Sequence, residues 1–137
     1  MKKLMFLLKN FYIFLIIGLI FSACAKQESL TSDSALAGVY NLVSVDGKKI
    51  PADITHEGTT IGIRSGSFTI EAGGKCKSKT VFVPPSGNEI IREVNATYTI
   101  DGSKLTMRWE NAGMTEGTLE GNTFTMNNEG MVLLYKK

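Results

Sequence analysis

From Gly38 to the C-terminus, apolar and polar residues alternate with a period of two, and short turns interrupt the alternation. Ala96, Tyr98 and Ile100 share one face of such a segment, while threonines and an asparagine take the other face. The pattern recurs after the next turn with Leu105 and Met107 on the apolar face. A period of two is typical of half-buried strands. The pattern predicts strands over residues 38–45, 59–64, 67–72, 76–83, 89–100, 104–110, 115–120, 123–126 and 131–136.

Turn-forming pairs separate most of these segments, namely Asp46-Gly47, Ser65-Gly66, Gly73-Gly74, Asp101-Gly102 and Gly121-Asn122. Such pairs favour tight hairpin turns. Residues 50–58 lack a regular alternation and are expected to be irregular. The order predicts an all-β domain, either a meandering barrel or a two-sheet sandwich. Short sequential turns favour a small antiparallel up-and-down barrel of about eight strands.

A different pattern marks the N-terminus. Three lysines (Lys2, Lys3 and Lys9) precede residues 11–21, which are all apolar or glycine. A basic segment before an apolar run of this length is typical of a secretory signal peptide. A transmembrane helix is the alternative, but it needs about 20 mostly apolar residues, and Lys9 and Lys26 bound this run. We therefore expect export.

The run ends in Phe21-Ser22-Ala23-Cys24, which resembles the lipobox of bacterial lipoproteins, with Phe21 where leucine is usual. The resemblance implies a signal peptide over residues 1–23 and a lipidated Cys24, of the kind that carries palmitate. Several acyl chains hold a protein to a membrane far better than one. Residues 24–37 then form a tether, and Ala25 after the cysteine favours the outer membrane. The alternative is an ordinary secretory signal cut near Ala23 or Ala25.

Removal of the leader changes the charge and the thiol count. All thirteen acidic residues follow Cys24, whereas three of the fifteen basic ones precede it, so the net charge falls from +2 to −1. A nearly neutral domain gives no electrostatic reason to expect nucleic-acid binding. Cys76 would be the remaining thiol, which excludes an intramolecular disulfide.

Residues 38–137 resemble the small lipocalin-like domains of bacterial lipoproteins. The resemblance implies an up-and-down barrel, often without a known enzymatic role. In true lipocalins a tryptophan usually stands where this chain has Tyr40. The motifs that carry the resemblance are Gly38-Val39-Tyr40-Asn41-Leu42, Val45-Asp46-Gly47-Lys48-Lys49-Ile50-Pro51, the hairpin over residues 96–105, Gly117-Thr118-Leu119-Glu120-Gly121-Asn122 and Leu134-Tyr135-Lys136-Lys137.

No set of residues selects a catalytic or metal chemistry, so we expect no enzyme activity, cofactor or metal. Asp53, His56 and Glu57 are too few for a usual zinc site. Cys76 has no evident base nearby to activate it as a nucleophile. Lys75, Lys77 and Lys79 form a basic stripe, which is either a contact surface or a solvated strand face. Two further sets are dispersed: the methionines Met107, Met114, Met126 and Met131, and the acids Glu110, Glu116, Glu120 and Glu129.

Two functional hypotheses follow for a domain that we expect to be monomeric and membrane-anchored. In the first, the barrel binds a small apolar or amphipathic ligand, lined by Tyr98, Met107, Trp109 and Phe124. In the second, the domain is an envelope structural factor or a hydrolase inhibitor that contacts a protein partner. Its contact loops would then be residues 51–58, 84–88 or 111–116. An inward-facing residue can line a cavity or fill a core, and periodicity does not separate the two.

Overall fold

The computed structural model describes residues 35–137, so the predicted signal peptide, Cys24 and nearly all of the tether lie outside the described range. Within it, one helical turn at residues 35–36 precedes ten strands. The strands are β1 (Gly38–Val45), β2 (Lys48–Lys49), β3 (Ala52–His56), β4 (Thr59–Glu71), β5 (Lys75–Val83), β6 (Ile90–Asp101), β7 (Lys104–Trp109), β8 (Met114–Glu120), β9 (Thr123–Asn128) and β10 (Met131–Lys136).

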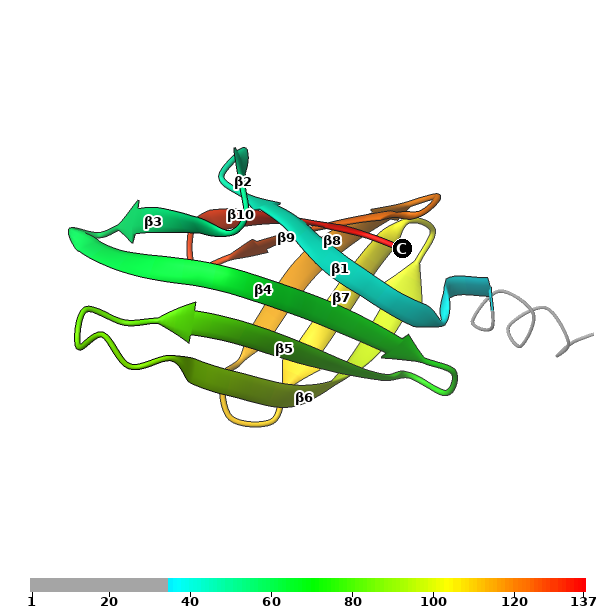
Figure 1. Cartoon of the computed structure of the whole chain (residues 1–137). Coiled ribbons are helices and arrows are strands. Elements are labelled where there is room, and N and C mark those ends of the chain that lie inside the picture. Colours follow the sequence, from blue (N-terminus) through cyan, green and yellow to red (C-terminus); the bar gives the residue numbers. More distant parts are fainter. Residues whose placement is uncertain (1–34) are drawn as a thin grey trace, which may run out of the picture. The chain divides into compact units, whose positions relative to one another are not determined.

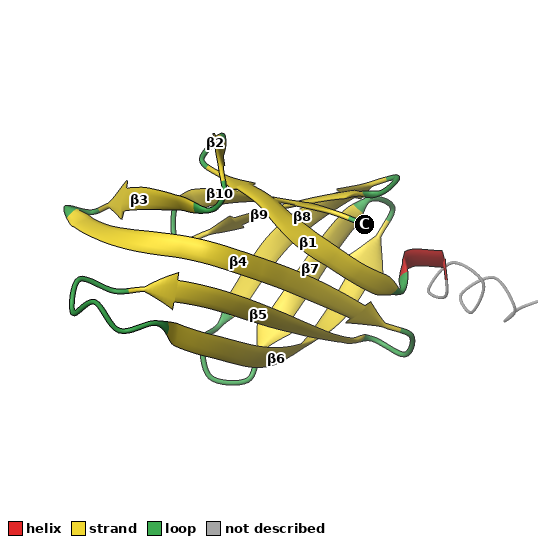
Figure 2. Cartoon of the chain, in the orientation of Figure 1, coloured by secondary structure: helices red, strands yellow, loops and turns green. Residues whose placement is uncertain are grey.

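The strands form a closed antiparallel barrel. From β4 to β10 each strand pairs with the next along the chain, and β1 closes the ring by pairing with both β10 and β4 (Figure 1). Figure 2 shows that strands account for almost all of the described chain. These pairings confirm the predicted all-β class and the small antiparallel up-and-down barrel of eight strands, with β2 and β3 as additions outside the ring.

Burial follows the alternation in the sequence. In β8 the side chains of Thr115 and Leu119 and the backbone at Gly117 are buried, and the residues between them are exposed. In β7 the buried residues are Leu105 and Met107. Because successive residues of a strand point to opposite faces, each strand contributes one apolar row to the barrel interior.

β1 and β4 pair only along part of their length. Gly38–Asn41 of β1 lie opposite residues 67–70 of β4, after which the strands diverge. β2 then pairs with the rest of β1, and β3 pairs with the first part of β4. The prediction of an irregular segment over residues 50–58 was therefore wrong, because Ala52–His56 form a strand. Ile54, which lies opposite Ile61, is buried and anchors this strand to the core.

The predicted turn at Ser65-Gly66 was also wrong. β4 runs through these residues as one strand of 13 residues, with a bulge between Ile63 and Ser65. The bulge shifts the inward face from odd to even positions. Gly66 serves close packing, since a Cβ atom there would lie 2.9 Å from Leu42 Cδ2 and 3.0 Å from Leu42 Cβ.

An aromatic cluster fills the centre of the barrel. Phe68 and Phe124 stack with ring centroids 4.6 Å apart, and the Tyr135 ring lies 6.0 Å and 5.8 Å from them. Tyr40 meets Phe124 edge to face at 6.4 Å. All four side chains are at most 1% exposed. We refer to Tyr40, Phe68, Phe124 and Tyr135 as the aromatic cluster.

The two ends of the barrel differ. At the end where the chain enters at Gly38, the Tyr40 hydroxyl donates to the Leu36 carbonyl at 2.9 Å, and Leu36 packs against the core. The C-terminal Lys137 lies at the same end, where its Nζ donates to the Ala37 carbonyl at 2.7 Å (Figure 1). We call this the closed end. The opposite, open end carries the β5–β6 and β7–β8 loops and the β9–β10 turn.

Candidate functional site

A pocket of about 140 Å³ lies inside the barrel on its open-end side. Its wall comes from β5, β6, β7, β9 and β10, together with the β7–β8 loop and the β9–β10 turn. The lining residues are Ser78, Thr80, Arg92, Val94, Trp109, Ala112, Met126, Asn128, Glu129, Leu133 and Tyr135. Six of the eleven lining residues are apolar or aromatic, and the five polar or charged ones are spread between the floor and the mouth. This combination is typical of sites for small molecules.

Tyr135 joins the pocket to the aromatic cluster. Its ring belongs to the packed centre, and its side chain also lines the pocket. Burial raises the pKa of the Tyr135 hydroxyl to about 12, although a hydrogen bond with Ser78 opposes this shift. The hydroxyl therefore remains protonated at ordinary pH. The floor of the pocket is a neutral surface with hydroxyl groups and no charge.

Trp109 forms a fixed part of the wall. Its indole Nε1 donates to the Thr115 hydroxyl at 2.8 Å, and its ring meets Phe68 edge to face at 6.4 Å. A buried indole usually needs such a partner for its N–H group. Thr115 is itself buried on the neighbouring strand β8. These two contacts hold the ring in one orientation beside the pocket.

The predicted lining residues lie at different depths. Trp109 lines the pocket, whereas Tyr98, Met107 and Phe124 are 6%, 0% and 0% exposed in the core. The Tyr98 hydroxyl donates to the Glu71 carbonyl at 3.0 Å, near the closed end. Whether any of the four residues contacts a ligand stays a prediction. Cys24, the predicted lipidation site, lies outside the described residues.

Sequence reasoning missed Arg92, which lines the pocket from β6. Arg92 lies opposite Thr80, another lining residue, and it shares the inward face of β6 with Val94 and Ala96. A signal was present in the sequence. Extending the inward row of β6 backwards by twos from Ala96 reaches Val94 and then Arg92. Arg92 is exposed, so it lies at the rim of the pocket, where its charged group stays in contact with solvent.

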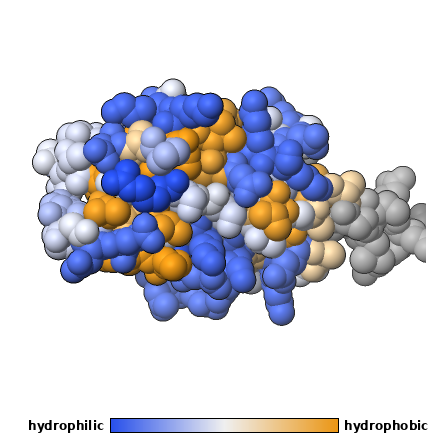
Figure 3. All heavy atoms as spheres, viewed as in Figure 1, coloured by the Kyte–Doolittle hydropathy of each residue, from blue (hydrophilic) through white to orange (hydrophobic). Residues whose placement is uncertain are grey.

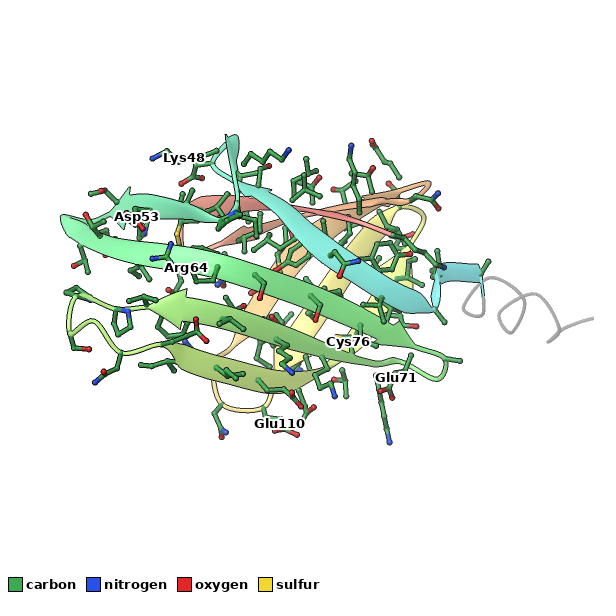
Figure 4. The ribbon with its side chains drawn as sticks, viewed as in Figure 1. Lys48, Asp53, Arg64, Glu71, Cys76 and Glu110 are labelled. Atoms are coloured by element: carbon green, nitrogen blue, oxygen red, sulfur yellow. The ribbon has the colours of Figure 1, made fainter. Side chains whose placement is uncertain are left out.

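A larger groove of about 510 Å³ lies over β5, β6 and β7, lined mainly by outward-facing charged and polar side chains. Lys77 of this groove forms an ion pair with Glu93 at 3.3 Å. Cys76 lies beneath it and is 3% exposed (Figure 4). Burial, with a smaller contribution from Glu71, raises the pKa of the Cys76 thiol to about 12. The thiol is therefore protonated at neutral pH and is a poor nucleophile.

The other candidate residues of the sequence do not gather in the pocket. Arg64 Nη1 forms a solvent-exposed ion pair with Asp53 Oδ1 at 3.5 Å (Figure 4). His56 Nε2 lies 3.9 Å from Glu57 Oε1. Residues 35–137 contain no group of three or more His, Cys, Asp or Glu side chains arranged to hold a metal ion.

The candidate methionines are likewise separated. Met107 and Met126 are buried in the core, and Met131 packs against it from β10. Met114 is 60% exposed, and its sulfur accepts a hydrogen bond from Arg108 at 3.9 Å. In the described part of the chain, no helix is both long and apolar enough to span a membrane.

Comparison with known proteins gives one similar solved structure. No protein-family model matches the chain, and no curated protein matches it. The chain is similar to a lipocalin-like protein from Bacteroides uniformis, with 14% sequence identity and a TM-score of 0.47. The similarity covers 75% of this chain and 98% of the other.

Proposed function

We propose that this protein is a non-enzymatic, membrane-anchored bacterial lipoprotein whose barrel binds a small ligand with an apolar group. The observation that carries the proposal is the pocket, which lies in the open half of the barrel above a packed aromatic floor. Burial of the apolar group supplies the affinity, and the polar groups at the mouth fix its orientation. The buried, protonated thiol of Cys76 supports a binding role over nucleophilic catalysis.

The size of the pocket limits the ligand. A dry protein cavity of about 150 Å³ is known to accommodate benzene, and this pocket measures about 140 Å³. It therefore accepts one ring or a short branched chain. Sites for drug-sized ligands are usually about 300 Å³ or more. The enclosed part of the ligand is thus a single apolar side group, and larger molecules such as haem do not fit inside.

Trp109 provides the test, because it is the sole tryptophan of the chain and lines the pocket. The full-length protein in lipid vesicles is titrated with phenol and with short branched alcohols, and indole fluorescence is recorded against protein-free vesicles. We expect a saturable change. Val94→Phe, which fills the pocket, should abolish it, whereas Val132→Phe on the exposed face of β10 should not. Equal responses from the two variants, or no saturation, would contradict ligand binding.

The membrane anchor is the second part of the proposal. Lys-flanked residues 11–21 and the lipobox-like Phe21-Ser22-Ala23-Cys24 support export and lipidation of Cys24. The described chain enters the barrel at its closed end, at Gly38, and the pocket mouth lies at the opposite end of the barrel. We assign the protein to the outer membrane.

The anchor is tested by mass spectrometry of the N-terminal peptide and by membrane fractionation. The wild type should carry acyl chains on Cys24 and sediment with outer membranes. Cys24→Ser should lose both properties, and Cys76→Ser, which changes the chain's other cysteine, should keep them. An unmodified Cys24 in the mature protein would refute the anchor but leave the pocket's function open to its own test.

A protein-interaction role is the second candidate function, and exposed apolar side chains favour it. Ile90 and Ile91 are 42% and 62% exposed where β6 begins, next to the β5–β6 loop. In Figure 3, apolar side chains gather over the open-end parts of β4 and β5. Ile91→Asp should abolish capture of a partner in a pull-down with the full-length protein, and Glu120→Gln at the closed end should not. Retained capture by the Ile91 variant would exclude this surface.

A further inference from the structure

One positive and one negative side chain line the pocket together with apolar groups. Arg92 and Glu129 are its charged lining residues. Arg92 reaches the pocket because it lies on the inward face of β6, opposite Thr80 of β5. Glu129 reaches it from the other side, from the turn that joins β9 to β10. The two charges thus approach the pocket from different parts of the barrel.

The backbone holds Glu129 at this place. Glu129 has φ of 52° and the following Gly130 has φ of 81°, so both central residues of the hairpin turn are left-handed. Two such residues are typical of the tight turn that matches the twist of paired strands. Glutamate is uncommon in this conformation, in which asparagine and glycine prevail. The Glu57-Gly58 turn outside the pocket has the same geometry, so the turn at Glu129 fixes where its backbone lies and does not by itself mark a binding role.

Neither charge is used in an internal ion pair. Residues 35–137 contain four ion pairs. They are His56 with Glu57, Arg64 with Asp53, Lys77 with Glu93, and Lys104 with Glu116. All of them lie outside the pocket lining. Arg92 and Glu129 are also too far apart to form an ion pair with each other within 4.0 Å. Each can therefore pair with a group of the ligand.

We propose that the ligand is a small zwitterion, an α-amino acid with an apolar side chain. Its carboxylate pairs with Arg92, its ammonium group pairs with Glu129, and its side chain occupies the apolar part of the pocket beside Val94 and Trp109. The proposal rests on the function proposed above and specifies the chemical class of the ligand.

Three features of the site fit this class. A guanidinium group binds a carboxylate through two parallel hydrogen bonds, which fixes the orientation of the bound molecule. A ligand with a carboxylate alone would bring a negative charge near Glu129, and a simple amine would bring a positive charge near Arg92. A zwitterion is complementary to both. The pocket volume of about 140 Å³ suits the branched side chain of leucine.

The test uses four ligands that share one branched apolar chain and differ in charge. They are L-leucine, 4-methylpentanoate, 3-methylbutylamine and 3-methylbutan-1-ol. Each is titrated into the full-length protein in neutral lipid vesicles by calorimetry and by Trp109 fluorescence. Because Arg92 and Glu129 are exposed, ion pairs with them contribute modestly, and we expect leucine to bind about tenfold more tightly than the alcohol.

Variants separate the two charges. Arg92→Gln should weaken binding of leucine and of the carboxylate severalfold and leave the amine unaffected or improved. Glu129→Gln should weaken binding of leucine and of the amine and spare the carboxylate. Neither variant should change binding of the alcohol. Lys79→Gln and Glu120→Gln, which remove charges outside the pocket lining, are the matched controls and should bind all four ligands as the wild type does.

The outcomes distinguish this inference from the proposed function. If the alcohol binds and leucine binds no more tightly, the zwitterion proposal is overturned and the pocket's apolar binding role stands. The zwitterion proposal is also overturned, and the apolar binding role stands, if either charge variant weakens binding of all four ligands equally. If none of the four ligands binds a protein that is folded by circular dichroism, the proposed function itself fails. Loss of the leucine preference in both charge variants supports the proposal.

Discussion

At the residue scale, Gly117 shows how a missing side chain shapes the core. A Cβ atom at this position would lie 2.5 Å and 2.7 Å from the Cε2 and Cζ atoms of Phe124 and 3.0 Å from the Thr125 carbonyl oxygen. Phe124 is fully buried in the aromatic cluster. Gly117→Ala should therefore lower the free energy of unfolding by about 1–3 kcal/mol, the usual cost of overpacking. Urea denaturation followed by circular dichroism measures it.

Two comparisons show whether the cause is the contact with Phe124. Thr118→Ala changes the neighbouring exposed residue and should cost much less. Adding Phe124→Leu to Gly117→Ala should give a double variant less destabilised than the sum of the two single changes, because residues in contact are not additive. Strict additivity would contradict a direct clash.

Cys76 makes stability depend on pH. Its pKa is raised from 9.0 to about 12 in the folded protein, mainly by burial. The unfolded thiol therefore loses its proton at lower pH than the folded one, and rising pH favours the unfolded state. Stability contributed in this way is complete below pH 9 and declines above it. Between pH 8 and pH 10 the wild type should lose about 1 kcal/mol more than Cys76→Ala does.

The measurement is urea denaturation of both proteins at several pH values in that range. The informative quantity is the difference between the two proteins in how steeply the free energy of unfolding changes with pH, because tyrosines and lysines titrate alike in both. Parallel pH dependences would show that the thiol ionises in the folded state as readily as in the unfolded one, and burial would then not control its chemistry.

The residue scale also shows where prediction from sequence stops. Alternation correctly placed Phe124 and Met107 inside the barrel, yet it could not tell a filled layer from an open one. The depth of a residue along the barrel axis depends on how the strands tilt and on the register between them, which are nonlocal properties. Trp109 and Phe124 look equivalent in the sequence, but only Trp109 reaches the open half.

At the element scale, the bulge in β4 explains why a turn was predicted at Ser65-Gly66, where the strand in fact continues. Ile61 and Ile63 occupy odd positions, whereas Phe68 and Ile70 occupy even ones, and a glycine lies between them. The change of parity was attributed to a turn, but a one-residue bulge produces the same change within a continuous strand. The remaining strand segments and most turns were predictable because their signals are local. β3 was missed because it is short and follows Pro51, and its partner β4 stabilises it.

The bulge gives a prediction about deletions. If Arg64 is deleted, Ile63, Gly66 and Phe68 fall into one regular inward alternation, and the register beyond them is preserved. The variant should fold and lose about 1–2 kcal/mol, since it lacks only the bulge and the exposed pair with Asp53.

Deletion of Thr69 is the matched control. Thr69 lies in the regular part of β4, between two inward residues. Its removal would point the inward residues on one side of the deletion toward solvent. This variant should not fold. Circular dichroism and near-ultraviolet signals of the aromatic residues distinguish the two results. Failure of both variants to fold would mean that the bulge itself is required for the divergence of β1 and β4.

At the scale of the whole molecule, the barrel has a packed part, which contains the aromatic cluster, and an open half, which contains the pocket. The aromatic cluster joins β1 and β4 to the C-terminal hairpin β9–β10, and all four of its side chains are at most 1% exposed. The open half carries half-buried side chains around a pocket. Stability should therefore depend on the first half and ligand binding on the second.

A pair of truncations tests this division. Phe68→Ala removes a fully buried ring that contacts Phe124, Tyr135 and Trp109, and it should lower the free energy of unfolding by about 3–5 kcal/mol. Val94→Ala enlarges a space that already exists, so it should cost less than about 1 kcal/mol.

Binding should respond in the opposite order. In protein that remains folded, Val94→Ala should alter the affinity for short branched ligands, because Val94 lines the pocket and Phe68 does not. Denaturation midpoints and Trp109 titrations on the same samples give both quantities. If Val94→Ala destabilised the protein as much as Phe68→Ala, the open half would be part of the stabilising core. The pocket would then be a packing defect and not a site that the fold can leave open at little energetic cost.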